Sequence, residues 1–175
     1  FDAIYNREHP PGFRWLHESF GTNWRMTEMQ AVIGRIQLRR MVEWTSMRQS
    51  NAQMLDNAAA SLKCIRLVDV PEYIKHAEYK HYLFVRPEYL AEGWGRDRIV
   101  DEIVKRGVPC FQGSCSEVYL EKAFDNTPWR PEKRLPNAVK LGETALMFLV
   151  HPTLSKKEIQ LTAKVMKEVL EIASL

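Results

Sequence analysis

The sequence predicts an α+β fold in which one long helix precedes a small, mostly antiparallel sheet covered by helices. A capping-box motif at Thr27 opens an apolar pattern of helical period, and no proline or glycine interrupts it between Gly34 and about Leu62. Short β-like runs then alternate with helical segments in the order α, β, β, α, β, α, α, β, α. The 175 residues are 45% hydrophobic, which supplies a core and excludes intrinsic disorder.

The first 26 residues read as an irregular lead-in, since Pro10-Pro11-Gly12 interrupts any regular period. In the helix expected over 27–62, the Thr27 hydroxyl is predicted to accept a hydrogen bond from the backbone amide of Gln30, and the Gln30 side chain to accept one from the backbone amide of Thr27. Met29, Ile33 and Ile36 form one stripe, and methionine and aromatic residues at this spacing are more typical of a core than of a cofactor site. The length of the helix suggests that it bridges two packed bodies.

The remainder, residues 63–175, predicts a small α+β domain. We expect strands over 65–70, 80–86 and 145–150, with His81, Leu83 and Val85 on one face of the second, and a short extended run over 108–111. Asp97 is predicted to cap a helix that stops at Gly107. Further helical segments are expected over 116–124 and 136–144, and a last helix is capped by Ser155 with Glu158 in the box position.

Composition narrows the class of function. The basic and acidic residues nearly balance, with a net charge of +3, which argues against a nucleic-acid partner. The sequence contains no stretch of 18 apolar residues, so we predict no membrane-spanning helix. The chain starts at Phe1 without a signal-peptide pattern, so we expect a cytoplasmic protein. Cys64, Cys110 and Cys115 are too few and too irregularly spaced for a disulfide framework or a structural metal site. We therefore predict no metal.

Familiar catalytic motifs are absent from the sequence, and we predict no catalytic residue in this chain. It holds no nucleophile elbow, no metalloprotease helix motif and no glycine-rich phosphate loop. The polar run from Gln112 to Ser116 could offer amides and hydroxyls to a ligand, although a plain turn is favoured. Cys115 lacks a visible base, and His81 and His151 are interpreted as structural.

One segment stands out chemically. Asn23 and Arg25 lie just ahead of the capped N-terminus at Thr27, so an amide and a guanidinium accompany the positive end of a helix dipole. Such donors suit an anion, and phosphate in particular. The segment therefore predicts an anion-binding site.

The same segment carries a family resemblance. The run Gly21–Ala31, followed at the right distance by Gln37-Leu38, resembles the signature of the DegT/DnrJ/EryC1/StrS sugar aminotransferases. Weaker blocks follow in the family's order and extend the resemblance over the whole chain: Tyr79–Tyr82, Arg96-Asp97, Gly107–Pro109, Leu135–Ala138 and Leu149–Ser155.

The resemblance implies a role for the chain. The family consists of fold type I enzymes that use pyridoxal 5'-phosphate (PLP) and act as homodimers with shared active sites. They move an amino group, typically from glutamate, to a nucleotide-linked keto sugar in polysaccharide or secondary-metabolite pathways. By resemblance, Asn23 would donate to the PLP phosphate in the partner subunit's site, and Arg25 would lie near the phosphates of the nucleotide sugar. Residues 27–62 would bridge to a large domain that precedes this chain.

Two departures from the family pattern matter. The chain corresponds to the C-terminal half, so the Schiff-base lysine is expected upstream and this segment alone is predicted to be inactive. Many members carry His-Tyr-Pro after the Gly-Ile/Val-Pro turn, where this sequence has Phe111, Gln112 and Gly113 before Ser114. We assign substrate contact to Phe111, Gln112 and Ser114. The alternative is a non-catalytic sugar-nucleotide-binding, regulatory or interaction domain of the same fold.

Overall fold

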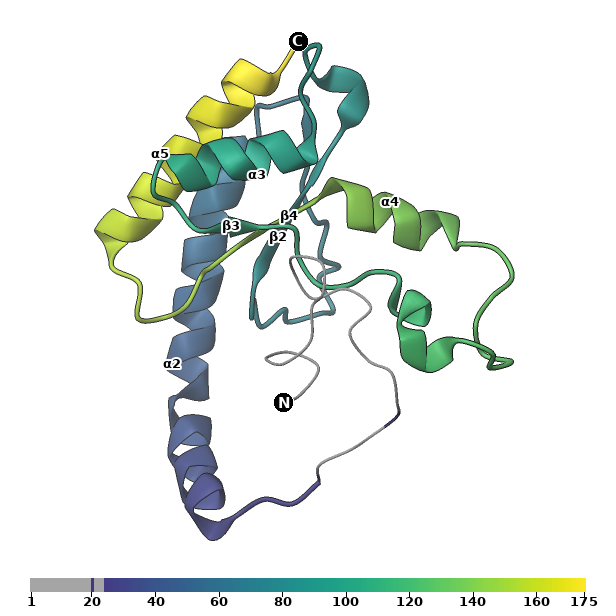
Figure 1. The fold of residues 1–175 in the computed structure, drawn as a ribbon. Helices are drawn as coiled ribbons and strands as arrows, with labels where there is room; N and C mark the ends of the chain where they lie inside the picture. The colour runs from purple at the N-terminus through teal and green to yellow at the C-terminus, as the bar shows by residue number, and fades with distance from the viewer. Residues whose placement is uncertain (1–19, 21–23) are drawn as a thin grey trace. The chain divides into compact units, whose positions relative to one another are not determined.

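The computed structural model describes residue 20 and residues 24–175 (Figure 1). The described residues form two units. One comprises Met26–Gly113 and Thr144–Leu175, and we call it the sheet unit. The other comprises Ser114–Glu143 with the described residues before Met26, and we call it the loop unit.

The sheet unit is built on four antiparallel strands in the order β1-β2-β4-β3. The strands are β1 (Ile65–Arg66), β2 (His81–Val85), β3 (Cys110–Phe111) and β4 (Ala145–Phe148). The predicted antiparallel sheet is thus confirmed. The strand expected over 65–70 was too long, because β1 pairs with β2 only at Ile65 and Arg66 before the chain leaves this edge toward Pro71.

The helices of the sheet unit are α2 (Glu28–Ala59), α3 (Arg96–Lys105) and α5 (Lys156–Ala173), with a 3-10 turn at Pro87–Tyr89. The loop unit contains 3-10 turns at Val118–Leu120 and Lys122–Phe124 and nearly all of α4 (Pro136–Thr144). Within the sheet unit, α5 packs against both α2 and α3, and α3 also contacts β3 and β4 (Figure 1). The element order therefore matches the sequence prediction.

Local chemistry explains where the helices begin. Thr27 and Ser155 both form complete capping boxes, with Gln30 and Glu158 as the reciprocal residues. The prediction that Asp97 caps α3 was wrong. The N-cap is Gly95, which has no side chain to cap with, and Asp97 lies inside the first turn. There its carboxylate still suits the positive helix end.

The core lies between the sheet and the helices of the sheet unit. The alternation in β2 is confirmed, since His81, Leu83 and Val85 are buried on one face. The largest fully buried side chains of the core include Phe148, Leu55, Leu83, Ile99, Ile103, Leu146, Ile159, Met166 and Leu170. Gly107 ends α3 with a φ of 81°, as a left-handed glycine stop should.

Helix α2 corrects one expectation about the core. Its buried residues are Ala52, Leu55 and Ala59, all near its C-terminal end. The stripe expected to be core is exposed instead: Met29 by 76%, Ile33 by 57% and Ile36 by 45%. Figure 1 shows why, because the N-terminal part of α2 extends away from α5 and the sheet. An apolar helix face on this scale indicates a surface meant for a partner.

Candidate functional site

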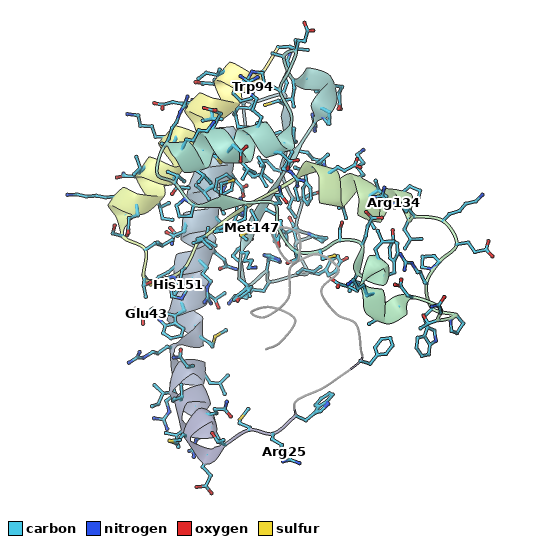
Figure 2. All side chains as sticks on the ribbon, in the orientation of Figure 1. Arg25, Glu43, Trp94, Arg134, Met147 and His151 are labelled. Atoms are coloured by element: carbon cyan, nitrogen blue, oxygen red, sulfur yellow. The ribbon has the colours of Figure 1, made fainter. Side chains whose placement is uncertain are left out.

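The predicted anion site lies at the start of α2. Asn23 is outside the described residues, and Arg25 is an exposed side chain two residues before the N-cap (labelled in Figure 2). The Thr27 hydroxyl accepts from the Gln30 amide at 3.3 Å, and the Gln30 side chain accepts from the Thr27 amide at 2.8 Å. This capping box uses one of the amides at the helix end, and Glu28 adds a negative charge in the first turn. Binding of an anion here remains a prediction.

The predicted substrate segment follows the edge strand β3. Phe111 pairs with Met147 of β4, and its side chain is 45% exposed. Gly113 then turns the chain with a φ of 88°, and a Cβ atom there would lie 2.8 Å from Cε1 of Tyr82. Because both the conformation and the space require glycine, the backbone on either side of Gln112 is fixed against the sheet.

The side chain of Gln112 is fixed as well. Its Nε2 donates to Oδ1 of Asp97 at 2.8 Å, and the same oxygen accepts from Nε of Arg96 at 2.7 Å. A second Arg96 nitrogen donates to the carbonyl of Ala145 at 3.2 Å, at the start of β4. The Arg96 side chain is only 6% exposed. The sequence predicts a helix start at Arg96-Asp97, whereas the contact with Gln112 is visible only in the tertiary structure.

The predicted site residues are divided between the two units. Phe111 and Gln112 are consecutive in the sheet unit, whereas Arg25 and Ser114 belong to the loop unit. In the sheet unit, Phe111 lies on the edge strand β3 and Gln112 directly follows it. The substrate-binding roles of Arg25, Phe111, Gln112 and Ser114 stay predictions.

The loop unit is held by an ion-pair network that the sequence did not indicate. The guanidinium of Arg134 (labelled in Figure 2) donates to both carboxylate oxygens of Glu117. The Tyr119 hydroxyl donates to Glu117 at 2.6 Å and accepts from the Leu135 amide at 2.9 Å. The hydrogen bonds from Arg134 and Tyr119 lower the pKa of Glu117 to about 2, so it stays ionised at any physiological pH.

His81 is interpreted correctly as a hydrogen-bonded structural residue, and it is more buried than expected. Its Nε2 lies 2.9 Å from Oδ1 of Asp56 on α2, and its Nδ1 lies 3.4 Å from Oε2 of Glu78. Burial lowers its pKa, but hydrogen bonds to the two carboxylates and their charges outweigh burial and raise the pKa to about 9. At neutral pH, His81 is therefore a cation that links β2 to α2.

His151 makes structural contacts, as interpreted from the sequence. Nδ1 of His151 lies 2.7 Å from the Thr153 hydroxyl, and Asn51 of α2 donates to the backbone carbonyls of Val150 and His151. Figure 2 accordingly shows His151 beside α2. Burial raises the pKa of the Cys110 thiol to about 12, which makes it a poor nucleophile.

Within the described residues, the three cysteines are thiols that form no disulfide. Across residue 20 and residues 24–175, no group of three histidine, cysteine or carboxylate residues is placed to hold a metal ion. In the same part of the chain, no helix combines the length and hydropathy needed to cross a bilayer.

Known proteins resemble this chain over nearly its whole length. Residues 6–169 match the model of the DegT/DnrJ/EryC1/StrS aminotransferase family. The chain is 28% identical over 145 residues to the erythromycin biosynthesis sensory transduction protein EryC1 of Saccharopolyspora erythraea, a match of 82% of this chain and 37% of that protein. It is also 28% identical, over 146 residues, to the dTDP-3-amino-3,4,6-trideoxy-alpha-D-glucose transaminase of Streptomyces venezuelae, a match of 83% of this chain and 36% of that protein.

A solved structure gives the same picture. The aminotransferase from Psychrobacter cryohalolentis is 54% identical and superposes with a TM-score of 0.78, over 98% of this chain and 45% of that one. The chain therefore spans less than half the length of each of these relatives.

Proposed function

The chain belongs to the DegT/DnrJ/EryC1/StrS aminotransferase family, and we propose that it is the C-terminal part of a PLP-dependent aminotransferase acting on a nucleotide-linked keto sugar. The observation that carries this proposal is the match to an aminotransferase of known structure over 98% of the chain at 54% identity. The name of the Streptomyces venezuelae relative, a transaminase of a dTDP-linked sugar, supports the nucleotide-linked substrate.

The described residues of the candidate site do not by themselves make a PLP site. Bound PLP would supply the electron sink for amino-group transfer, and a lysine amine would be needed to hold it. Among the described site residues (Arg25, Phe111, Gln112 and Ser114) none is a lysine. We place that lysine in a large domain that precedes this chain in the parent protein, so the chain alone is inactive.

The contribution of this chain would be binding and positioning. In the proposal, Asn23 donates to the cofactor phosphate in the partner subunit's site, and Arg25 binds the pyrophosphate of the nucleotide sugar. An exposed guanidinium suits this task because it pairs with phosphate oxygens through two parallel hydrogen bonds. Phe111, Gln112 and Ser114 contact the sugar. A homodimer is required because Asn23 serves the neighbouring site.

We also propose that the chain is organised in three parts. Residues 1–26 carry the active-site loop, 27–62 bridge to the large domain, and 63–175 form the small C-terminal domain. The apolar face of α2 supports this division, since its N-terminal part buries no residue within the described structure. A large domain packed on Met29, Ile33 and Ile36 would remove them from water. We place the protein in the cytoplasm.

The first test is the coding sequence upstream of Phe1 and the absorbance of the full-length product. We expect an upstream lysine in the family's context, and an aldimine absorbance that borohydride abolishes. A reading frame without that lysine, or a product without the chromophore, would support the alternative of a non-catalytic binding or regulatory domain. The name of the EryC1 relative, a sensory transduction protein, is the observation that favours this alternative.

The second test concerns Arg25. Replacing Arg25 with alanine in the parent protein should raise the KM for the nucleotide sugar about tenfold, since charge-assisted hydrogen bonds to phosphate are among the strongest. Arg35→Ala is the matched control, because Arg35 is an exposed arginine within α2. Equal effects of the two substitutions would mean that general positive charge, and not a specific contact, is responsible.

A further inference from the structure

Residues 71–80, which we call the strap, lie between β1 and β2 in the sequence and have little apolar packing to hold them. Residues 71–77 and Tyr79 are exposed, whereas the side chain of Glu78 is only 15% exposed. The backbone at Glu78 is left-handed, with a φ of 47°, a conformation that is unfavourable for a residue with a Cβ atom. The polar contacts of Glu78 therefore have to offset this cost.

Two side chains of α2 hold the strap. Nε2 of Gln49 donates to the backbone carbonyl of His76 at 2.7 Å. Oδ1 of Asp56 lies 2.9 Å from Nε2 of His81, the first residue of β2, which follows the strap. Gln49 and Asp56 are about two helical turns apart and lie on the same side of α2. The second half of the strap therefore runs beside α2 between these two contacts.

The carboxylate of Glu78 meets two histidines. Its Oε1 lies 2.8 Å from Nδ1 of His76, and its Oε2 lies 3.4 Å from Nδ1 of His81. Carboxylates and imidazoles thus alternate from α2 to the strap in the order Asp56, His81, Glu78, His76. Burial acts to raise the pKa of Glu78, but hydrogen bonds to the two histidines and their charges outweigh burial and lower it. Glu78 is therefore ionised at neutral pH.

The number of protons on His81 decides whether both carboxylates are bound. Within the described residues, Asp56 from α2 and Glu78 from the strap are the charged groups that face its ring. An imidazolium has one N–H donor for each of them, whereas a neutral imidazole has a single donor. The contact with Asp56 is the shorter one, at 2.9 Å against 3.4 Å, so a neutral His81 keeps Asp56. Glu78 then faces a ring nitrogen that no longer donates.

We propose that the strap is a pH-sensitive latch: when His81 loses its proton, the contact with Glu78 breaks and residues 71–80 open away from α2 while the sheet stays folded. Because the two carboxylates raise the pKa of His81 to about 9, the latch is closed at neutral pH and opens as the pH rises through this value. Opening exposes the side of α2 between Gln49 and Asp56. The inference involves no ligand and does not depend on the proposed function.

Limited proteolysis of the full-length protein tests the latch. The rate of trypsin cleavage after Lys75, divided by the rate for a free peptide of residues 71–80, measures the fraction of molecules whose strap is open. At pH 7, Glu78→Gln should raise this fraction about tenfold, the equivalent of one charge-assisted hydrogen bond. Glu72→Gln is the matched control, since Glu72 is an exposed carboxylate of the same segment, and it should leave the fraction unchanged. Equal fractions in the wild type and Glu78→Gln would overturn the proposal.

Amide exchange in β2 distinguishes local opening from global unfolding. The backbone amides of Leu83 and Val85 lie in the sheet, so their protection reports the fraction of unfolded molecules. This fraction should be at least about a hundredfold smaller than the open fraction measured by cleavage after Lys75. Equal fractions would mean that the strap opens only when the sheet unfolds, which would refute a latch.

The pH dependence tests the route through His81. The open fraction of the wild type should rise about tenfold between pH 7 and pH 10 with a midpoint near 9, and His81→Gln should remove this dependence. Asp56→Asn should move the midpoint to lower pH, because one of the two carboxylates that stabilise the imidazolium is gone. Asp56 lies on α2, outside the strap, so a segment that is merely looser would not shift the midpoint. An unshifted midpoint would refute the route, and this result decides alone should His81→Gln fail to fold.

Discussion

The buried histidine of β2 gives a prediction whose size follows from the structure. His81 is 3% exposed and lies between two carboxylates, which raise its pKa from the ordinary value of 6.5 to about 9. A pKa difference of this size between the folded and unfolded chains corresponds to about 3 kcal/mol of stability. Because the folded pKa is the higher one, this stability is fully present below pH 6.5 and is lost as the pH rises through 9.

The assay combines a titration with unfolding. In the chain labelled at its histidines, the ring signals of His81 should titrate near pH 9, and Asp56→Asn should move that midpoint toward the ordinary value. Urea unfolding should show that the wild-type chain loses about 3 kcal/mol more than His81→Gln between pH 6 and pH 9.5.

The exposed His151 supplies a control for the substitution itself, through the variant His151→Gln. A His81 midpoint near 6.5 would refute the assignment of His81 as a cation. Identical pH dependence in the wild type and His81→Gln would refute its role in linking β2 to α2.

The remaining predictions concern the loop after β3, a helix cap and the exposed helix face. Gly113→Ala should lower the free energy of unfolding by about 1–2 kcal/mol, because the backbone at Gly113 is left-handed and the new Cβ would lie 2.8 Å from the Tyr82 ring. Gly34→Ala in α2 is the control, since its Cβ would meet nothing within 4 Å and the variant should be neutral or stabilising. Equal free energies of unfolding for the two variants would contradict this prediction. Ser155→Ala should cost about 1 kcal/mol in the same assay by removing the capping box of α5, and an unchanged value would mean that packing alone fixes this helix. The isolated chain should self-associate through α2, so Ile33→Glu should shift its concentration-dependent light scattering toward the monomer; an Ile33→Glu chain that associates as strongly as wild type would exclude this surface.

The candidate site shows how rigid scaffolding and a divergent loop are combined. Phe111 and Gln112 differ from the pattern that many members of the family carry at this position, yet their backbone is fixed by β4 on one side and by Gly113 on the other. Under the proposed function, in which these residues contact the sugar, a change of residue type here would alter substrate preference without a change of fold.

The sequence determined the elements that depend on local chemistry. Both capping boxes, the proline at the start of α4, the glycine stop after α3 and the alternation in β2 were readable because each depends on residues within one turn or one strand. The family resemblance was likewise a property of ordered local motifs. The small antiparallel sheet was also predicted, although the pairing of β2 with β4 joins strands that lie far apart in the sequence.

Tertiary structure decided what local patterns leave open. The stripe of Met29, Ile33 and Ile36 has the same sequence pattern whether it is buried in the core or exposed for an interface. The helical spacing shows that one face of the helix is apolar, but it does not show which partner covers that face. The link from Arg96 through Asp97 to Gln112 joins residues 15 positions apart, and Asp56 reaches His81 across 25 positions. Such contacts depend on how strands and helices pack, so the charge on His81 and the orientation of Gln112 were settled only by the folded chain.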